Sequence, residues 1–427
     1  MGNKNLARRV TVKLYFKGKD ISKELSKYLI SMTYTDNEED KADDISLTLD
    51  DREGRWIKDW LYTGRKKKTI TGGITKAGST TTTGNITGLI HDTVIETEKD
   101  ITVQGSGSTG YSLKGQDNGG TVKTKASKTK AGTVKAEKTE ENTKRAFKGT
   151  EIHALVVQKN FLSDGKDKVL DCGVFEIDEV SCQGPPQKLT IKATSIPYKT
   201  HLRQTRHRKA WENTSLKNIA SKIAKRSGMK IMYISKFNPV YKRKEQKNKT
   251  DIAFLKMLCK KAGISLKVTS KTIVLFDAAE FEKKNEVKKI TAGKSNITSY
   301  SFSTKTADKA YSGCHVQYTD PRTKKKTEYT YKPGNASKDG QMLEIKQKVS
   351  NIEEAKVLAK KSLRQKNKGE TTAEFTLVGD VGYVAGITVR VKGFGEFDGK
   401  YIVEQAVHTV TGGYKVQVKL RRCLEGY

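Results

Sequence analysis

The chain has 427 residues, and its 82 Lys and Arg against 48 Asp and Glu give a formal net charge of +34. This length is enough for two to four domains with cores of their own. The charge points to polyanions or acidic proteins as partners, although dispersed lysines more often form a solvated surface. The five cysteines form no C-x-x-C pair, which argues against a zinc site or the disulfide framework of a secreted protein.

The sequence contains no segment typical of a signal peptide or a membrane span. The N-terminus lacks an apolar core, and no stretch approaches ~18 consecutive apolar residues. Leu6 stands where an N-myristoylation motif needs Ser or Thr. We therefore expect a soluble protein, made in a cytoplasm, with no membrane partner.

The first 64 residues and residues 148–199 predict one antiparallel barrel. Apolar side chains alternate over 10–16 and 45–49, as in half-buried strands, and three more strand candidates follow residue 150. The acidic run 38–44 lacks EF-hand spacing, so we expect a solvated loop rather than a metal site. Trp56 and Trp60 lie four residues apart, which suits one short helix at the barrel mouth.

Residues 65–147 differ in composition from both flanks. They are rich in Thr, Gly, Ser and Lys and contain no Pro, Cys or Trp. Such a segment buries little apolar surface to offset its ordering entropy, so alone it should be flexible or form a thin β extension. We predict an inserted peripheral segment whose removal leaves the rest of the protein folded.

Residues 200–285 predict a small α/β domain. Apolar residues keep helical spacing over 216–224 and over 252–262, and these helices end at Gly228 and Gly263. Thr214 or Ser215 is the expected cap of the first helix. Short apolar runs between and after the helices are strand candidates.

Residues 286–427 predict a second antiparallel barrel with an inset helix at 351–367, opened by a capping box from Ser350 to Glu353. Near its end, residues 393–405 read GFGEFDGKYIVEQ. The glycine spacing is one residue too long for a dinucleotide fingerprint, and a β-rich run follows. We therefore expect the glycines to form a tight turn with positive φ angles rather than a phosphate loop.

No catalytic, cofactor-binding or metal-binding residues are predicted. Lys288 stands where the GKS at 293–295 would need a glycine to be a phosphate loop. Cys314 and His315 are neighbours on a predicted strand and should face opposite sides. The carboxylates Glu176 and Asp178 share a strand face, but surface pairs of this kind are seldom catalytic. The run HLRQTRHRKAW from residue 201 fits a nucleic-acid contact or a basic linker equally well.

Three stretches resemble one family. They are LDCGVFEIDEVSCQGPP with LTIKATSIP, the helical segment from WENTSLKNIASKIAKRSGMKI to TDIAFLKMLCKKAGISLKV, and VAGITVRVKGFGEFDGKYIVEQAVHTVTGGYKVQVKLRR. They resemble the baseplate hub proteins of contractile phage tails, the late control gene D family, whose fold is shared with the hub portion of type VI secretion spikes. The resemblance covers most of the chain apart from residues 65–147.

The resemblance implies a structural role without catalysis. It implies a homotrimer with two similar barrels per subunit, so that a pseudo-sixfold ring joins the hexameric tail tube to the trimeric spike. The implied partners are the spike, tube, tape-measure and other baseplate proteins, and DNA could pass transiently through the channel. The implied location is the tail baseplate of a virion or a bacteriocin-like particle, assembled in the bacterial host cytoplasm.

Two alternatives remain open at this point. The chain could be a hub-associated cell-wall hydrolase, for which residues 65–147 are the only available place, or a basic nucleic-acid-binding protein. If it is a hub, we expect the excess charge to lie on outer and partner-facing surfaces rather than along the channel.

Overall fold

The computed structural model describes residues 8–56, 149–161, 167–196, 201–269, 271–307, 309–334, 336, 340–349 and 351–426, together with five strands between residues 70 and 134. The chain divides into two compact units. One consists of Met1–Ile57 with Phe147–Tyr427, and the other is Lys58–Ala146. Each unit is described by itself below.

The first β region of the larger unit is antiparallel, as predicted. Its strand order is β3-β4-β12-β11-β10-β1-β2, with one short helix, α1, beside β1 and β4. The alternating residues Leu14, Leu47 and Ile191 are buried. The elements are β1 (Arg9–Phe16), β2 (Lys19–Asp20), α1 (Ser22–Tyr28), β3 (Leu29–Asn37), β4 (Asp44–Asp50), β10 (Glu151–Lys159), β11 (Lys168–Gln183) and β12 (Lys188–Thr194).

The second β region has the order β18-β24-β25-β26-β23-β19 and shares one apolar core. All six strands contribute to that core, from Ile290 on β18 to Phe302 on β19. The two end strands, β18 and β19, are consecutive in the chain and joined by a short turn. The elements are β18 (Lys288–Thr291), β19 (Ile297–Thr304), β23 (Thr371–Val378), β24 (Thr388–Lys392), the 3-10 turn η2 (Gly395–Phe397), β25 (Gly399–Val410) and β26 (Tyr414–Arg422).

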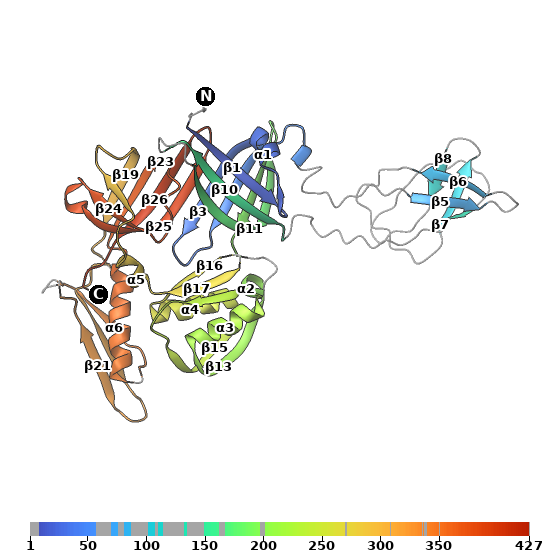
Figure 1. The fold of residues 1–427 in the computed structure, drawn as a ribbon. Coiled ribbons are helices and arrows are strands. Elements are labelled where there is room, and N and C mark those ends of the chain that lie inside the picture. The colour runs from blue at the N-terminus through green and yellow to red at the C-terminus, as the bar shows by residue number, and fades with distance from the viewer. Residues whose placement is uncertain are drawn as a thin grey trace. The chain divides into compact units, whose positions relative to one another are not determined.

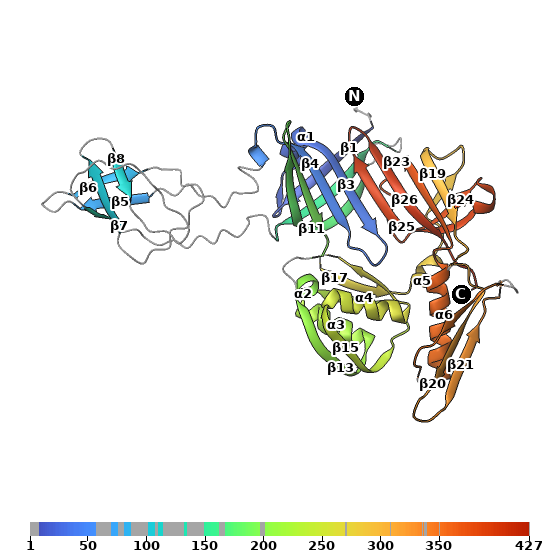
Figure 2. The same ribbon diagram turned by 180° about the vertical axis from the view of Figure 1, so that it is seen from behind.

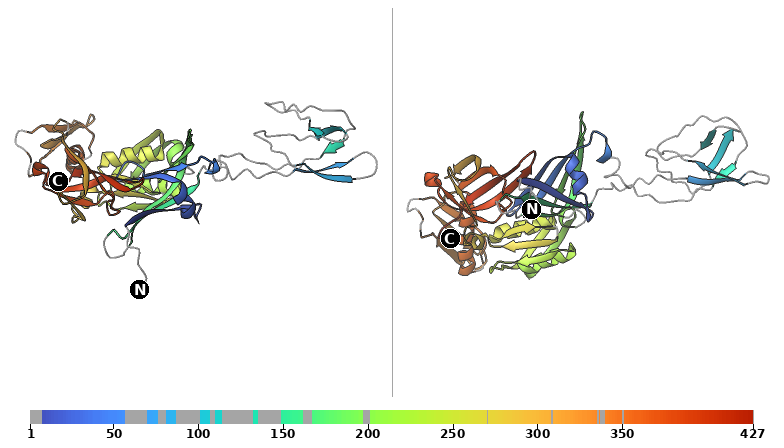
Figure 3. Two further views of the ribbon diagram at one scale, coloured as in Figure 1. Left: turned by 90° about the horizontal axis from the view of Figure 1, so that it is seen from above. Right: turned by 45° about the horizontal axis from the view of Figure 1, so that its top comes forward.

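One long strand, β25, joins the two regions into a single sheet of 13 strands. Residues 399–402 of β25 pair with β24, and residues 405–410 pair with β3. The register shift at Val403/Gln405, where β25 runs along β26, lies at this change of partner. Figures 1 to 3 show the red strands of the second region meeting the blue strands of the first. The sequence predicted the mainly β fold correctly, but it gave no indication of this link.

The α/β unit has the two predicted helices at the predicted places, packed on one core (Figure 1). Ser215 caps α3, Thr250 caps α4, and Gly263 ends α4 at φ 61°. The sequence did not predict the charged strands β13 and β15, which pair as a two-stranded ribbon. The elements are α2 (His201–Gln204), β13 (Arg206–Ser215), α3 (Leu216–Arg226), β14 (Lys230–Tyr233), β15 (Val240–Thr250), α4 (Asp251–Ala262), β16 (Ser265–Val268), β17 (Thr272–Phe276) and α5 (Ala278–Glu282).

A small lobe, called here the helical lobe, consists of α6 (Ile352–Asn367) packed on β20 (Gly313–Thr319), β21 (Lys326–Tyr331) and β22 (Met342–Ile345). The predicted helix is present, and its N-cap is Asn351, whose side chain accepts a hydrogen bond from the Glu354 amide. The predicted capping box began one residue earlier, at Ser350, which lies outside the described residues.

The smaller unit contains a five-stranded sheet in the order β6-β5-β9-β7-β8. Its strands are β5 (Ile70–Thr75), β6 (Thr81–Ile86), β7 (Ile101–Ser106), β8 (Gly110–Leu113) and β9 (Gly132–Val134). Trp60, predicted to share a short helix with Trp56, lies outside the described residues. In the described part of the chain, no helix combines the length and the apolar character needed to cross a membrane.

Candidate functional site: an ionic junction at the acidic loop

The acidic loop, residues 36–44 at the turn between β3 and β4, is partly buried. The sequence predicted a solvated loop at 38–44, and that prediction is wrong for Glu38 and Asp43, which are only 4% and 7% exposed. Asp40 and Asp44 are exposed, as predicted. The loop meets the α/β unit, the helical lobe and strand β26, and each of them supplies it with cations. No charge pattern within the run could reveal this, since its counter-ions come from more than 200 residues further along the chain.

Arg421 of β26 is the centre of the junction, and its side chain is fully buried. Its guanidinium lies 3.1 Å from a carboxylate oxygen of Glu38 and 3.2 Å from Glu404 of β25, and it donates to Glu282 of α5. Arg364 of α6 contacts the same Glu282 carboxylate at 2.5 Å. The sheet, the α/β unit and the helical lobe therefore share one ion cluster.

Three lysines hold the rest of the loop. Lys267 of β16 lies 2.6 Å from Asp36 and 3.3 Å from Asp43. Lys368, just after α6, pairs with Glu39. Lys256 of α4 donates to the Asp40 carbonyl at 2.9 Å.

The loop backbone also joins the α/β unit directly. The amide of Asp40 donates to the Leu266 carbonyl on β16 at 2.9 Å. The loop therefore continues the edge of the three-stranded sheet β14-β17-β16 by one main-chain hydrogen bond.

Burial and charge act in opposite directions on these acids. Burial raises the pKa of Glu38 to about 7, although Arg421 partly opposes the shift. Burial likewise raises the pKa of Asp43 to about 6 against the effect of Lys267. For Glu282, burial raises the pKa, but Arg421 and Arg364 together bring it below its ordinary value. The ionised forms of these buried acids are therefore stable only while their cationic partners stay in place.

Chemically, this arrangement suits fixing the parts of the unit to one another. Among the described residues, no group of three or more His, Cys, Asp or Glu side chains is arranged to hold a metal ion. Basic side chains fill the space between the acids instead. Removing one partner of a buried ion cluster leaves the other charge buried without a counter-ion. Such a cluster therefore fixes the relative positions of the elements that it joins, even where it adds little net stability.

The glycine-rich turn at 393–399 has the predicted conformation. Gly393 and Gly395 have φ angles of 86° and 64°, and the chain then enters β25. The Asp398 carboxylate accepts hydrogen bonds from the Gly393 and Phe394 amides. No phosphate-binding geometry is needed to explain these glycines.

The same turn presents aromatic rings to the end strand β19. Phe302 stacks on Phe397 with ring centroids 4.5 Å apart, and Phe394 lies 5.0 Å from Tyr300 and 5.2 Å from Phe302. We call this cluster, completed by Phe375 of β23, the aromatic seam. It packs β19 and β23 against the glycine-rich turn.

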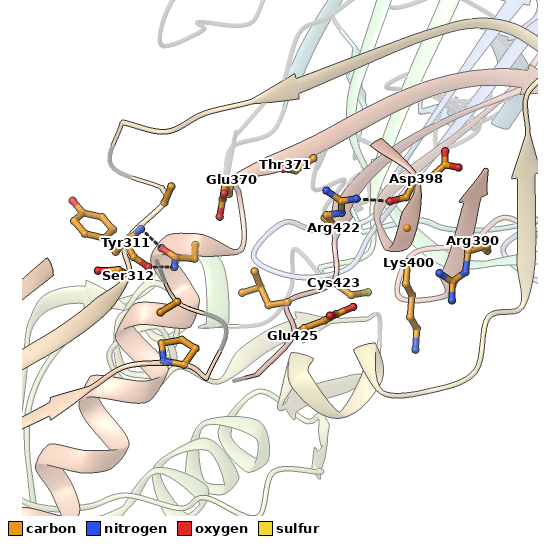
Figure 4. A pocket seen from close by; sticks show the side chains of 16 residues that line it. Tyr311, Ser312, Glu370, Thr371, Arg390, Asp398, Lys400, Arg422, Cys423 and Glu425 are labelled. Carbon is orange, nitrogen blue, oxygen red and sulfur yellow. Dashed lines mark hydrogen bonds between the residues drawn. The ribbon is translucent and has the colours of Figure 1, made fainter. Parts of the chain in front are cut away.

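A groove of about 530 Å³ lies between β24–β26 and the start of the helical lobe. Figure 4 shows Arg422 bonded to the backbone at Asp398, with Glu370 and Lys400 nearby. Burial raises the pKa of Glu370. Side chains of both signs line the groove, and two of its cations already have partners, Arg390 an ion pair with Glu286 and Arg422 the backbone carbonyls. It therefore offers no selective site for a charged ligand.

Cys314 and His315, the first of the candidate pairs, have different surroundings. Cys314 is buried in the helical lobe, where burial raises its pKa to about 12, while His315 contacts Thr330 at 2.8 Å. The register of β11 against β12 shifts between Ile177 and Glu179, at Asp178, and Asp178 pairs with Arg203 at 3.3 Å. The GKS at 293–295 forms the turn between β18 and β19.

The basic run from residue 201 forms α2 and most of β13, so the interpretation as a linker is wrong. Its aromatic residue, Trp211, is 4% exposed and stacks on Phe254. Trp211 is therefore unavailable for stacking on a base, which weakens the nucleic-acid alternative at this place.

Comparisons with known proteins place this fold among tail proteins. The tail protein of Neisseria meningitidis MC58 matches with a TM-score of 0.57 at 10% identity, covering 97% of this chain and 96% of that one. The 43 kDa tail protein of prophage MuSo2 from Shewanella oneidensis matches with a TM-score of 0.55 at 12% identity, covering 96% and 98%. A chain of the Francisella PdpA-VgrG complex matches at 0.51 and 8% identity, covering 99% of this chain and 54% of that one.

At these identities the likeness is one of fold, and it agrees with the resemblance found in the sequence. No curated protein sequence matches the chain. A family model described as YQBQ-like matches residues 181–421, which is more than half of the chain. The chain therefore belongs to the YQBQ-like family.

Proposed function

We propose that this protein is the central structural hub of the baseplate of a contractile phage tail or a tail-like particle. Three copies would form a ring with pseudo-sixfold symmetry, placed between the hexameric tail tube and the trimeric spike. The tape-measure protein would end at the ring, and DNA or another cargo would pass through its channel. The proposal assigns the chain no catalytic activity.

The observation that carries the proposal is the pair of β regions joined side by side through β25 and β3. Both regions are antiparallel throughout apart from the parallel pair β18 and β24. Two similar regions per subunit, in three subunits, supply six units to a ring, which is what a trimeric adaptor for a sixfold tube requires. The fold match over nearly the full length of two tail proteins supports the same reading.

The ends of the large sheet offer surfaces for such a ring. The strand order ends at β19 on one side and at β2, next to β1, on the other. Exposed apolar side chains lie at or near the β19 end, including Tyr300 on β19 at 58% and Val378 on β23 at 51%. Open edges of this kind pair with other chains unless they are covered, so assembly through them follows naturally.

The ionic junction fits a mechanical role. A hub must hold its β regions at fixed angles to the domains that contact neighbouring proteins, and the acidic loop ties the sheet to both of those domains.

The test is the mass of the purified protein by light scattering, alone and with its spike and tube proteins. We expect a trimer, completed at the latest when the spike protein is present. A chain that stays monomeric with both partners at micromolar concentration would overturn the proposal. Zymography on cell-wall material tests the rival hydrolase, and we expect no lysis.

A further inference from the structure

The two edges of the three-stranded sheet β14-β17-β16 differ in whether another segment of the chain covers them. At the β16 edge, the acidic loop covers the sheet through the Asp40 amide and the ion pairs of Lys267. At the other edge, β14 pairs only with β17 among the described residues. One edge is therefore covered by an acidic segment of the same chain, and the other is open.

The open edge is apolar where a strand would lie. Ile231 and Tyr233 of β14 turn inward onto the core of the α/β unit. The alternate residues Met232 and Ile234 are 51% and 46% exposed. An exposed apolar edge strand is a template for pairing with another extended chain.

The free main-chain groups are those of Ile231 and Tyr233. The amides of Lys230 and Ile234 donate to the Lys271 and Leu275 carbonyls on the β17 side. Because alternate residues of a strand point their amides to opposite edges, the amides of Ile231 and Tyr233 point outward. They are available to an added strand.

The surroundings of this edge are strongly basic. Residues 213–244, which form α3, β14 and the start of β15, contain nine Lys and Arg and no Asp or Glu. Among the described residues, six of these cations have no ion-pair partner and their side chains are mostly exposed: Lys217, Lys222, Lys225, Lys230, Lys236 and Lys242. Like charges gathered without counter-ions favour an acidic partner.

We propose that the β14 edge binds an extended acidic segment of another protein, which adds a fourth strand to this sheet. The acidic loop at the β16 edge shows the chemistry on the same sheet, with a main-chain hydrogen bond for the backbone and lysines for the carboxylates. A second copy of this chain is a poorer occupant, because two surfaces with the charge of residues 213–244 repel each other. This inference does not depend on the proposed hub role.

The experiment uses the full-length protein and a fluorescent synthetic peptide in which Glu and Val alternate. We expect saturable binding by fluorescence anisotropy, and about tenfold weaker binding by the variant K230E/K236E. The matched control K294E/K325E makes the same change of charge at two exposed lysines elsewhere and should bind within about twofold of wild type. M232E/I234E should lose binding as K230E/K236E does.

Two further peptides separate the contributions. A peptide in which Lys and Val alternate should not bind. A Glu-Val peptide with N-methylated backbone amides on alternate residues should bind at least about tenfold more weakly than the unmethylated peptide. Equal binding of the methylated peptide would overturn strand addition. An equal loss of peptide affinity in K230E/K236E and K294E/K325E would show a non-specific effect of charge and would overturn the proposal of a site at β14.

Two results would identify a different occupant and overturn the proposal. One is self-association of the protein that M232E/I234E abolishes in the absence of peptide. The other is competition by double-stranded DNA with higher affinity than the peptide. Far-UV circular dichroism of every variant checks that the exposed substitutions leave the fold unchanged.

Discussion

Arg421 is the residue on which the ionic junction depends. We predict that Arg421→Ala lowers the free energy of unfolding by about 3–5 kcal/mol, because Glu38, Glu282 and Glu404 lose their shared cation. Urea denaturation followed by tryptophan fluorescence measures the change. Lys419→Ala, an exposed position on the same strand, should change it by less than about 0.5 kcal/mol. Equal changes in the free energy of unfolding for the two variants would show that the junction contributes no more to stability than an exposed residue.

Glu38 gives the junction a pH dependence. Its pKa is about 7 in the folded protein against an ordinary value of 4.5, so the folded state holds the proton more tightly. Its favourable contribution is complete below pH 4.5 and is lost as the pH rises through about 7. Glu39, Glu404, Lys368 and Arg421 face the same carboxyl and are retained in the variant below.

We therefore predict that the free energy of unfolding of wild type falls, relative to Glu38→Gln, as the pH rises across this window. Denaturant unfolding at closely spaced pH values measures the difference. Identical pH profiles for the two proteins would contradict the assignment, whatever their difference in absolute stability.

At the scale of elements, the aromatic seam tests how the second β region is held at β19. Phe302 contacts Phe375, Phe394 and Phe397, and truncating it leaves a gap between β19 and the glycine turn. We predict that Phe302→Ala costs about 2–4 kcal/mol, somewhat less than a fully buried phenylalanine. Thr298→Ala, at an exposed position of the same strand, is the control. An equal change in melting temperature for the two variants would contradict the prediction that the aromatic seam stabilises β19.

The segment 65–147 makes a second prediction at this scale. Replacing residues 66–147 with a four-residue turn containing glycine should leave a folded protein, because loop-closure entropy penalises a long insertion by only about 0.6 kcal/mol per doubling of length. The described strands of the smaller unit pair only with one another, in agreement with this expectation. Circular dichroism and a thermal melt measure folding, and light scattering measures assembly.

A shortened chain that does not fold would show that the segment belongs to the core of the larger unit. A chain that folds but forms no ring would instead make the segment a partner-binding arm. The boundaries of the segment stay a prediction until that experiment.

Local patterns predicted the elements well and their long-range partners poorly. Helical spacing and terminal glycines located α3 and α4, and alternation located β1 and β4. Strand β15 was missed because its sequence, VYKRKEQKNKT, has almost no apolar alternation and one buried residue, Gln246. The burial of the acidic loop was missed for a related reason, since Arg421 and Lys368 are remote in sequence and no local signal connects them to Glu38 and Glu39.

At the scale of the whole molecule, the candidate site consists of ion pairs and hydrogen bonds between elements that are distant in sequence, and it contains no local sequence motif. The sequence suggested a tail protein by resemblance, and the absence of a catalytic site stays a prediction. The sequence could not indicate that β25 changes partner from β24 to β3, because strand propensity along β25 does not specify which strands pair with it. The side-by-side joining of the two β regions is therefore a result of the structure alone.

The central claim is that three copies of this chain form one pseudo-sixfold ring between tube and spike. Cryo-electron microscopy of particles that carry the protein tests it most directly, with symmetry determined separately for tube, hub and spike. We predict threefold density at the hub, with two β regions of each copy alternating around a ring aligned with six tube subunits. Six copies at that level, a single copy, or density for this chain only outside the central axis would contradict it.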